Sequence, residues 1–310
     1  MTLRHRISPE TRLKSLDQLI HNNRPVRAIE AHNGLSALIG EEASVKNDGK
    51  KRTFDAFWLS SLTGTAVQGL PDAELLDYQS RIETIDEVLN VTQKPLIVDA
   101  DTGGSPSQFE YFVDNLQRLG VSAVIIEDKQ FPKRNSLDAS ANQDLESPNK
   151  FANKLERGNN IKRNEEFMII ARIESLIAGE GMKDALLRAQ KYLESGVDGI
   201  MIHSKESNPD KILEFAQEYE TLCAPLADSR PPLIVVPTTY NSITDKELAQ
   251  HGCDIIIHAN HLLRSAHKAM KDTAEEILRT DRGSDVEPYC SPTSEIFETV
   301  GFDRIKSKDT

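Results

Sequence analysis

The sequence predicts an α/β protein in which eight parallel strands close into a barrel surrounded by helices. Eight short apolar runs recur along the chain, and amphipathic segments lie between successive runs. Runs that alternate with helices in this way indicate parallel strands buried on both faces of a sheet. Eight strands close a TIM-type (β/α)8 barrel, and 310 residues are enough to build one. An open, doubly wound sheet is the alternative.

The first expected element is a helix that begins at Ser8 and Pro9. Serine is a favoured N-cap and proline suits the first helical position, and Leu13, Leu16 and Ile20 follow at helical spacing. The eight expected strands come next along the chain. They are VRAIEA (26–31), FDAFWLS (54–60), PLIVDA (95–100), AVIIED (123–128), MIIARIE (168–174), DGIMIH (198–203), PLIVVP (232–237) and DIIIHA (254–259).

The segments between these strands have the patterns of amphipathic helices. An apolar stripe from Phe109 to Leu116 stops at Gly120, and a second stripe stops at Gly196. Glycine is favoured just after the last turn of a helix, so both positions mark expected helix ends. Pro209 is expected to open a further helix.

Two connections are long and polar. Residues 40–53 are expected to be exposed, and residues 129–166 form an insert after the fourth strand. A βα loop usually has about 2 to 6 residues, and long loops at this position often act as lids, so the insert is interpreted as a lid. The barrel domain is expected to span residues 1–280. Residues 281–310 form a polar tail with no assigned role.

Charge and composition exclude several functions. A net charge of -12 opposes binding to nucleic acid or to an anionic membrane, so any anionic ligand needs a local cluster of cations. The chain has neither a signal-peptide pattern nor an apolar run near the roughly 20 residues of a membrane span, which predicts a cytoplasmic protein. The three cysteines, Cys223, Cys253 and Cys290, are too scattered for a metal site or a disulfide framework.

Charged residues gather at the ends of the expected strands. Because the strand ends of a parallel barrel meet at one rim, these residues are expected to lie together. Unpaired buried charges cost several kcal/mol each, so these groups must pair, bind a metal or face water. They are Asp99 and Asp101 of the third strand, Glu127 and Asp128 of the fourth, Arg172 and Glu174 of the fifth, and His203 of the sixth.

The acids suit a magnesium ion. Asp99 and Asp101 are two apart and project to one face, Gly103 and Gly104 allow a tight turn after them, and Glu127 adds a third carboxylate. Mg²⁺ prefers a few carboxylates together with waters and substrate oxygens. The alternative is a structural network in which the acids pair with Arg172 and Lys129.

Several other side chains are candidate ligands for an anion. Arg172 interrupts an apolar strand, where it binds either a phosphate or carboxylate ligand or an internal acid. A lone histidine such as His203 is more often a core residue than a catalytic one, but its place at a strand end favours a role in the site. Lys133, Asn135 and Ser136 lie on the expected lid and are suited to closing over a metal-bound anion.

The segment EDKQFPKRNS (127–136) resembles the lid motif E-D-K-x-x-P-K-x-N-S of the phosphoenolpyruvate mutase family, part of the isocitrate lyase and phosphoenolpyruvate mutase superfamily of α/β barrels. The resemblance extends in order over roughly residues 26 to 270. The further matching segments are EAHNGLSALI (30–39), FWLSSLTGTAVQGLPDAE (57–74), IVDADTGG (97–104), ARIESLIAGEGMKDALLRA (171–189), GIMIHSK (199–205) and VPTTYNSIT (236–244).

The resemblance implies an isomerase that interconverts phosphoenolpyruvate and phosphonopyruvate and so makes a carbon–phosphorus bond for phosphonate biosynthesis. It also implies roles for residues of this chain. Asp99, Asp101 and Glu127 would surround Mg²⁺, and Ser60, Leu62 and Ser136 would bind the substrate. Arg172, His203 and Asn135 would hold the phosphoryl group, and Lys133 would close the lid. Asp72 would lie near the migrating group, either as a covalent acceptor or as an orienting group.

Three alternatives follow from the same resemblance. A phosphonopyruvate hydrolase would share the barrel and metal site but lack the lid asparagine, so Asn135 favours the mutase. Carbon–carbon lyases of the superfamily carry a lid cysteine, whereas this lid reads KRNS. A catalytically silent binding protein is the third. Family members commonly form dimers or tetramers by exchanging the last barrel helix, a part that residues 259–279 could play.

Overall fold

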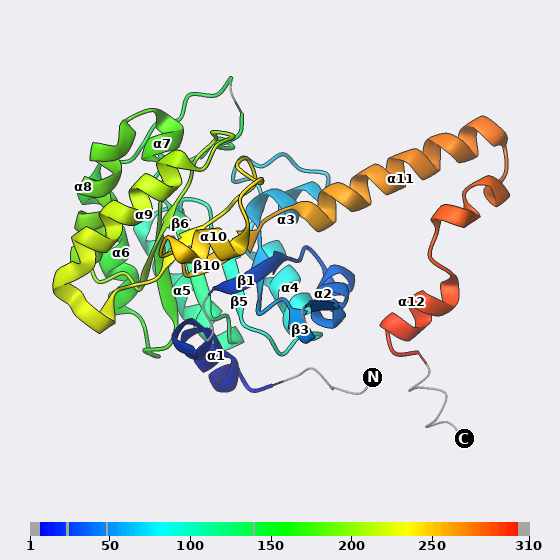
Figure 1. Ribbon diagram of the computed structural model, residues 1–310, viewed down its shortest axis with the longest axis horizontal. Helices are drawn as coiled ribbons and strands as arrows, with labels where there is room; N and C mark the ends of the chain where they lie inside the picture. The colour runs from blue at the N-terminus through cyan, green and yellow to red at the C-terminus, as the bar shows by residue number, and fades with distance from the viewer. Residues whose placement is uncertain (1–6, 23–24, 48, 139, 303–310) are drawn as a thin grey trace.

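The computed structural model describes residues 7–22, 25–47, 49–138 and 140–302, and it confirms the predicted barrel. Eight parallel strands close on themselves in the order β1-β10-β9-β8-β7-β6-β5-β4, and helices surround them (Figure 1). Each predicted strand forms at its predicted place. The strands are β1 (Val26–Glu30), β4 (Ala56–Leu59), β5 (Leu96–Asp99), β6 (Ala123–Glu127), β7 (Met168–Ile173), β8 (Gly199–Ile202), β9 (Leu233–Val235) and β10 (Ile255–His258).

The helices begin and end where local chemistry favours it. In α5 (Pro106–Leu119), the Ser105 side chain accepts the Gln108 N–H, and Gly120 ends the helix in the left-handed conformation (φ 83°). The other helices up to the last strand are α1 (Pro9–Asn22), α2 (Gly34–Glu42), α3 (Ser61–Ala66), α4 (Tyr78–Leu89), α6 (Pro148–Asn160), α7 (Ser175–Ala178), α8 (Gly181–Glu194), α9 (Asp210–Cys223), the 3-10 helix η1 (Ala224–Ser229) and α10 (Asp245–Gln250).

The core has two parts, divided by the strands. Side chains such as Ile97, Ile125 and Met201 belong to the smaller cluster, whereas Val98 and Val124 belong to the larger one with the apolar faces of the helices. Successive side chains of a strand point to opposite faces, so each strand contributes to both clusters. This alternation also decides which charged residues at the strand ends face the barrel axis.

Two of the expected connections contain regular structure. The polar segment after α2 holds an exposed antiparallel hairpin of β2 (Ser44–Asn47) and β3 (Lys50–Thr53). The second half of the expected insert forms α6, because the Ser147 side chain accepts the Lys150 N–H and Pro148 occupies the first turn. Residues 161–166, after α6, are irregular. So are residues 129–138 and 140–147, before α6, which we call the lid.

The chain leaves the barrel after β10 and forms a projecting arm (Figure 1). The long helix α11 (His261–Thr280) has no buried residue. The 3-10 helices η2 (Gly283–Asp285) and η3 (Glu287–Tyr289) and the helix α12 (Thr293–Thr299) follow it. Residues 303–310 of the expected polar tail lie outside the described residues.

Two further sequence expectations concern cysteines and membrane spans. Cys223, Cys253 and Cys290 are all free thiols, the first two buried and the third exposed. None of the helices formed by the described residues combines the length and the apolar character needed to cross a membrane.

Candidate active site

The charged residues predicted at the strand ends do meet at one rim of the barrel. Glu127 of β6 is in register with Arg172 of β7, and Asp99 of β5 is in register with Ile125 of β6. The backbone N–H of Glu127 also donates to the carbonyl of Asp101, at 2.8 Å. The acids of β5 and β6 and the guanidinium of β7 are thus neighbours, although they are far apart in the sequence.

Asp99 and Asp101 are buried and held by different partners. Asp99 Oδ2 accepts the Ser61 hydroxyl at 2.9 Å, and its Oδ1 accepts the Asp101 N–H at 3.1 Å. Asp101 Oδ2 is hydrogen-bonded to Arg81, whose guanidinium also reaches the Asp99 carbonyl. Burial alone would raise the pKa of Asp101, but Lys133 and Arg81 outweigh it and hold that pKa below its usual value. Asp101 is therefore ionised.

Glu127 is the least satisfied acid of the rim. It is buried, and neither of its carboxylate oxygens accepts a hydrogen bond from a described residue. Arg172 and Lys129 lie 3.2 and 3.8 Å from these oxygens. Burial raises the pKa of Glu127 to about 7 in spite of Arg172, Lys133 and Lys129. A buried acid without hydrogen bonds is costly, which indicates that the site is built to meet a further partner there.

The carboxylate oxygens of these acids are the type of ligand that a hard divalent cation binds. Carboxylates are the side chains that Mg²⁺ prefers, and the Glu127 oxygens accept no hydrogen bond from a described residue, which suits such a partner. The arrangement in this structure is not a finished metal cage, because Asp101 faces Arg81 and Lys133. Over the described residues, no group of three or more His, Cys, Asp or Glu side chains converges as a set of metal ligands.

Arg172 lies at the centre of a second group of buried polar side chains. Its Nε donates to Glu174 Oε1 at 2.5 Å, and its Nη2 lies 3.0 Å from Ser136 Oγ and 2.9 Å from His203 Nδ1. Burial would lower the pKa of Arg172, but Glu174, Glu127 and Asp99 raise it. The guanidinium is thus a permanent cation at the rim.

His203 and Glu174 complete this group. His203 Nδ1 lies 2.9 Å from Glu174 Oε1, and burial lowers the pKa of His203 although Glu174 opposes the change. The imidazole is therefore neutral near pH 7. The pKa of Glu174 lies well below its usual value because Arg172 and His203 outweigh the effect of burial.

The lid is closed over the rim. Lys133 Nζ lies 2.7 Å from Asp101 Oδ1 and 3.1 Å from Asp72 Oδ1, and it donates to the Ser61 hydroxyl at 2.8 Å. Asn135 Nδ2 donates to Asp72 Oδ2 at 2.6 Å. Burial would lower the pKa of Lys133, but Asp101 and the other acids raise it well above its usual value. The lid thus inserts an ammonium group among the acids.

Ser136 anchors the lid from the other side. Its hydroxyl donates to Glu174 Oε2 at 2.6 Å, and Lys129 Nζ lies 2.5 Å from the same hydroxyl. Lys129 also pairs with Glu174 at 3.2 Å. The lid therefore contacts both the acids of β5 and the Arg172 group.

A small cavity of about 60 Å³ lies between the lid and the rim. This is well below the roughly 300 Å³ of a small ligand pocket. Lys133 and Asn135 of the lid fill part of this space. The lining includes Ser60, Leu62, Asp72, Asp99, Lys133, Asn135, Ser136, Arg172 and His203 together with Trp58, Met201, Thr238 and Asn260.

The structure brings together the residues proposed from the sequence. Ser60, Leu62, Asp72, Lys133, Asn135, Ser136, Arg172 and His203 line one cavity with Asp99, while Asp101 and Glu127 contact its lining residues. Asp128, also at a strand end, points the other way and accepts from Tyr192 and Arg188. The ion pairs of Arg172 and Lys129 with the acids, expected for a structural network, are also present.

The strand-end pattern placed Glu174 at the rim without a role, and it did not indicate three further residues that shape the site, Ser61, Arg81 and Glu74. Ser61 is a polar residue that directly follows an expected strand, and Glu174 is an acid two residues after Arg172. These positions are the signals that could have indicated a role for each. Arg81 and Glu74 lie in α4 and in the loop before it, so no strand-end rule points to them. Only the packed structure shows that their side chains turn toward the rim.

The arrangement is suited to binding a small anionic substrate together with a cation that lies between the substrate and the acids. The acids form one pole, and Arg172, neutral His203 and the lid amide form the other. Fixed donors of this kind stabilise charge that shifts within a substrate, especially when a closed lid excludes water.

Comparisons with known proteins identify the family. Residues 16–278 match the family model described as phosphoenolpyruvate phosphomutase. A phosphoenolpyruvate phosphomutase of Tetrahymena pyriformis is 33% identical over 91% of this chain and 88% of its own length. The solved phosphoenolpyruvate phosphomutase of Streptomyces platensis subsp. rosaceus superposes with a TM-score of 0.87 at 34% identity, over 96% of this chain and 98% of that one. A solved phosphonopyruvate hydrolase in complex with oxalate and Mg²⁺ superposes with a TM-score of 0.83 at 30% identity, over 97% and 98% of the two chains. The chain belongs to the phosphoenolpyruvate mutase family, within a superfamily of enzymes that also includes hydrolases and lyases.

The Arg172 group generates a stability prediction. Glu174→Gln keeps the shape of the side chain but removes the charge that pairs with Arg172 and Lys129. Breaking a buried ion pair in this way is expected to lower the free energy of unfolding by about 3 kcal/mol. Urea unfolding measures the loss. The exposed Glu180→Gln is the control, expected to change stability by less than about 0.5 kcal/mol; equal effects of the two substitutions would contradict the prediction.

Proposed function

We propose that this protein interconverts phosphoenolpyruvate and phosphonopyruvate by moving a phosphoryl group between oxygen and carbon of the same molecule. One observation carries the proposal. The lid places an ammonium and an amide, Lys133 and Asn135, on the same carboxylate, Asp72, at 3.1 and 2.6 Å. This pair faces the Arg172 and His203 group across one cavity. The family match supports the reaction class.

The basic and amide groups would hold the phosphoryl group. Its transfer passes through a loose, metaphosphate-like state, so the protein's task is to position the group and to stabilise its charge. Arg172 supplies the permanent cation, neutral His203 a ring nitrogen and Asn135 a lid amide. Ser60, Leu62 and Ser136 would bind the remaining substrate oxygens, and Asp72 would lie beside the transferred group.

A divalent cation, Mg²⁺, is part of the proposal. Asp99, Asp101 and Glu127 would hold it, as supported by their hard oxygen donors and by the Glu127 oxygens, which accept no hydrogen bond from a described residue. When bound, the cation would stabilise the negative charge of the pyruvate enolate. Lys133 would then leave Asp101 and contact the substrate, with its charge retained.

Water exclusion separates this reaction from hydrolysis. In the mutase reaction the carbon–phosphorus bond breaks and the enol oxygen of the same molecule binds the phosphorus. A water molecule in the cavity would compete for the phosphorus and give pyruvate and phosphate instead. The closed lid and the small cavity support the intramolecular reaction. The lid asparagine, Asn135, favours the mutase over the hydrolase.

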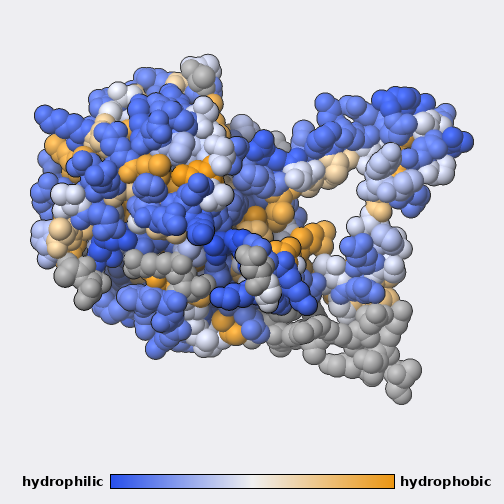
Figure 2. Space-filling model, viewed as in Figure 1, coloured by the Kyte–Doolittle hydropathy of each residue, from blue (hydrophilic) through white to orange (hydrophobic). Residues whose placement is uncertain are grey.

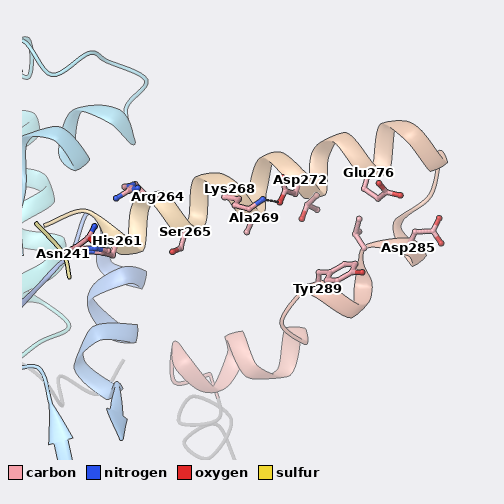
Figure 3. A pocket seen from close by; sticks show the side chains of 12 residues that line it. Asn241, His261, Arg264, Ser265, Lys268, Ala269, Asp272, Glu276, Asp285 and Tyr289 are labelled. Atoms are coloured by element: carbon pink, nitrogen blue, oxygen red, sulfur yellow. Dashed lines mark hydrogen bonds and ion pairs between the residues drawn. The ribbon is translucent and has the colours of Figure 1, made fainter. Parts of the chain in front are cut away.

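We also propose that the chain forms a homo-oligomer by exchanging α11. The helix extends away from its own barrel in Figure 1, and none of its residues is buried. Its apolar side chains Met270 and Leu278 are 63% and 82% exposed. Figure 2 shows hydrophobic surface on the barrel beside the base of the arm. A groove of about 1010 Å³ lies between α11 and η2–η3, with Arg264, Lys268 and Tyr289 in its lining (Figure 3). A second copy supplies a matching barrel for the exposed helix.

The reaction itself is the first prediction of this proposal. With Mg²⁺ and phosphonopyruvate, the purified protein is expected to produce the phosphate ester signal of phosphoenolpyruvate in phosphorus NMR. Inorganic phosphate as the sole product would indicate a hydrolase, and unchanged phosphonopyruvate would indicate a binding protein. Either result would contradict the mutase proposal.

A matched pair of lid variants accompanies this experiment. Asn135→Ala removes the amide on Asp72, whereas Asn142→Ala removes an exposed lid amide that bonds only Asp144. Only the first is expected to slow formation of the ester, because only Asn135 lines the cavity.

The raised pKa of Glu127 predicts a pH dependence of metal binding. A cation must displace the proton from this carboxyl, and the proton is bound increasingly as the pH falls below about 7. The apparent Mg²⁺ affinity is therefore expected to fall up to about tenfold per pH unit below that value. Fluorescence of Trp58, the single tryptophan, reports binding because it lines the cavity. Glu127→Gln should remove the dependence; an unchanged dependence in that variant would exclude Glu127 as its source.

The exchanged helix predicts the mass in solution. Light scattering after size-exclusion chromatography is expected to give a multiple of the 34.6 kDa chain mass. Leu278→Glu places a charge on the exposed apolar side chain of α11 and should release monomers, whereas Leu187→Glu, on an exposed position of α8, should not. A monomeric wild-type protein would contradict the exchange.

A further inference from the structure

The loop between α3 and α4, residues 67–77, packs against the lid through one carboxylate. Glu74 Oε2 accepts the backbone N–H of Lys133 at 2.9 Å. Its Oε1 accepts both the N–H of Thr102 at 3.0 Å and the Thr102 hydroxyl at 2.6 Å. A single side chain therefore bridges the lid and the turn that follows β5.

The two backbone segments that Glu74 joins also carry the two partners of an ion pair. Lys133 supplies the ammonium of the lid, and Thr102 directly follows Asp101, the carboxylate that this ammonium contacts at 2.7 Å. Glu74 thus holds together the two backbone segments that carry the contact. Glu74 does not line the cavity, and its hydrogen bonds reach the site through these two segments.

The turn on the Thr102 side is firmly held. The Thr102 hydroxyl donates to Glu74 and accepts the N–H of Gly104 at 3.2 Å, and Lys154 Nζ donates to the Thr102 carbonyl at 2.8 Å. Gly103 and Gly104 have φ of 75° and 65°, which glycine adopts without steric cost. The lid end, in contrast, belongs to a segment that would move to admit the proposed substrate. Glu74 is therefore anchored on the fixed side and can release the moving side.

The backbone of Glu74 supports a specific role for its side chain. Its φ is 55°, in the left-handed region that residues other than glycine, asparagine and aspartate rarely occupy. Such conformations persist where surrounding contacts enforce them, and they gather at ligand clamps and switch regions. In Glu74 the enforcing contacts are the hydrogen bonds to Thr102 and Lys133.

We propose that Glu74 is a positioning residue that latches the lid in its closed state. The latch places Lys133 and Asn135 on Asp72 and keeps water from the cavity. Without it the lid spends more time open, although the residues lining the cavity are unchanged. The effect on the reaction products rests on the proposed mutase function; the effect on the lid does not.

An open lid has a defined chemical consequence for the mutase reaction. Water enters and its oxygen binds the phosphorus as the carbon–phosphorus bond breaks. The electron pair of that bond stays on the pyruvate enolate, which takes up a proton at carbon. The products are pyruvate and inorganic phosphate, and no further reactant is needed. A loosened lid therefore raises the phosphate produced relative to phosphoenolpyruvate.

The opening of the lid is measured on the full chain by acetylation of lysines with an N-hydroxysuccinimide ester, followed site by site with mass spectrometry. Lys133 is 3% exposed, so its amine reacts only when the lid opens. Glu74 binds the backbone of this residue and not its amine, so the readout does not report the deleted contact itself. Lys94, which donates to carbonyls of α2, is the internal reference for the rest of the barrel.

Two variants and one control define the result. In Glu74→Ala all of the bridging hydrogen bonds are lost, and the acetylation rate of Lys133 is expected to rise by roughly tenfold or more. Glu74→Gln keeps the size of the side chain but only one of its two acceptor oxygens, so a smaller rise in the acetylation rate of Lys133 is expected. Glu83→Ala removes an exposed glutamate of α4 and should leave the rate unchanged. The phosphate-to-ester ratio in phosphorus NMR should follow the same order.

Two outcomes would overturn the latch. One is a Lys133 rate in Glu74→Ala equal to that in Glu83→Ala. The other is an equal rise at Lys94, which would make Glu74 a residue of general stability. If the wild-type protein shows no mutase turnover, the proposed function fails, but the acetylation rates still decide whether Glu74 holds the lid.

Discussion

The structure depends on one constraint, the need to satisfy a permanent cation buried at the rim of the barrel. The Arg172 guanidinium lies within 4 Å of carboxylates from three strand ends: Asp99, Glu127 and Glu174. Removing one of these carboxylates leaves the buried cation less well compensated, which lowers stability. The strands must therefore keep the register that places these side chains together. Stability and the shape of the site are set by the same contacts.

The lid contributes to the same network of buried charges. Lys133 enters the acids of β5, and Ser136 binds Glu174 of the Arg172 group. In this arrangement the positive charges of the lid and of Arg172 meet the protein's own acids. The proposed substrate would have to replace some of these internal ion pairs.

Much of the barrel and part of the site follow from local sequence rules. Apolar runs and helix caps predicted the strands and the end of α5 at Gly120, since these patterns act over a few residues. The two-residue alternation of a strand also explains why Glu127 faces the site while Asp128 binds Arg188 and Tyr192 outside the barrel. Local sequence patterns do not predict contacts that reach the site from outside the barrel strands. Arg81 and Glu74 reach the rim from the α4 region, and the direction of α11 depends on packing that no short pattern encodes.

We propose that the acids and Arg172 enclose one binding site, which Lys133 occupies when the lid closes without substrate. A crystal structure of the protein with Mg²⁺ and oxalate tests this most directly, because oxalate has the shape and charge of the pyruvate enolate. The account predicts both ligands between Asp99 and Arg172, with Lys133 moved away from Asp101. Ligands bound elsewhere, or a Lys133–Asp101 contact that persists beside a bound metal, would contradict it.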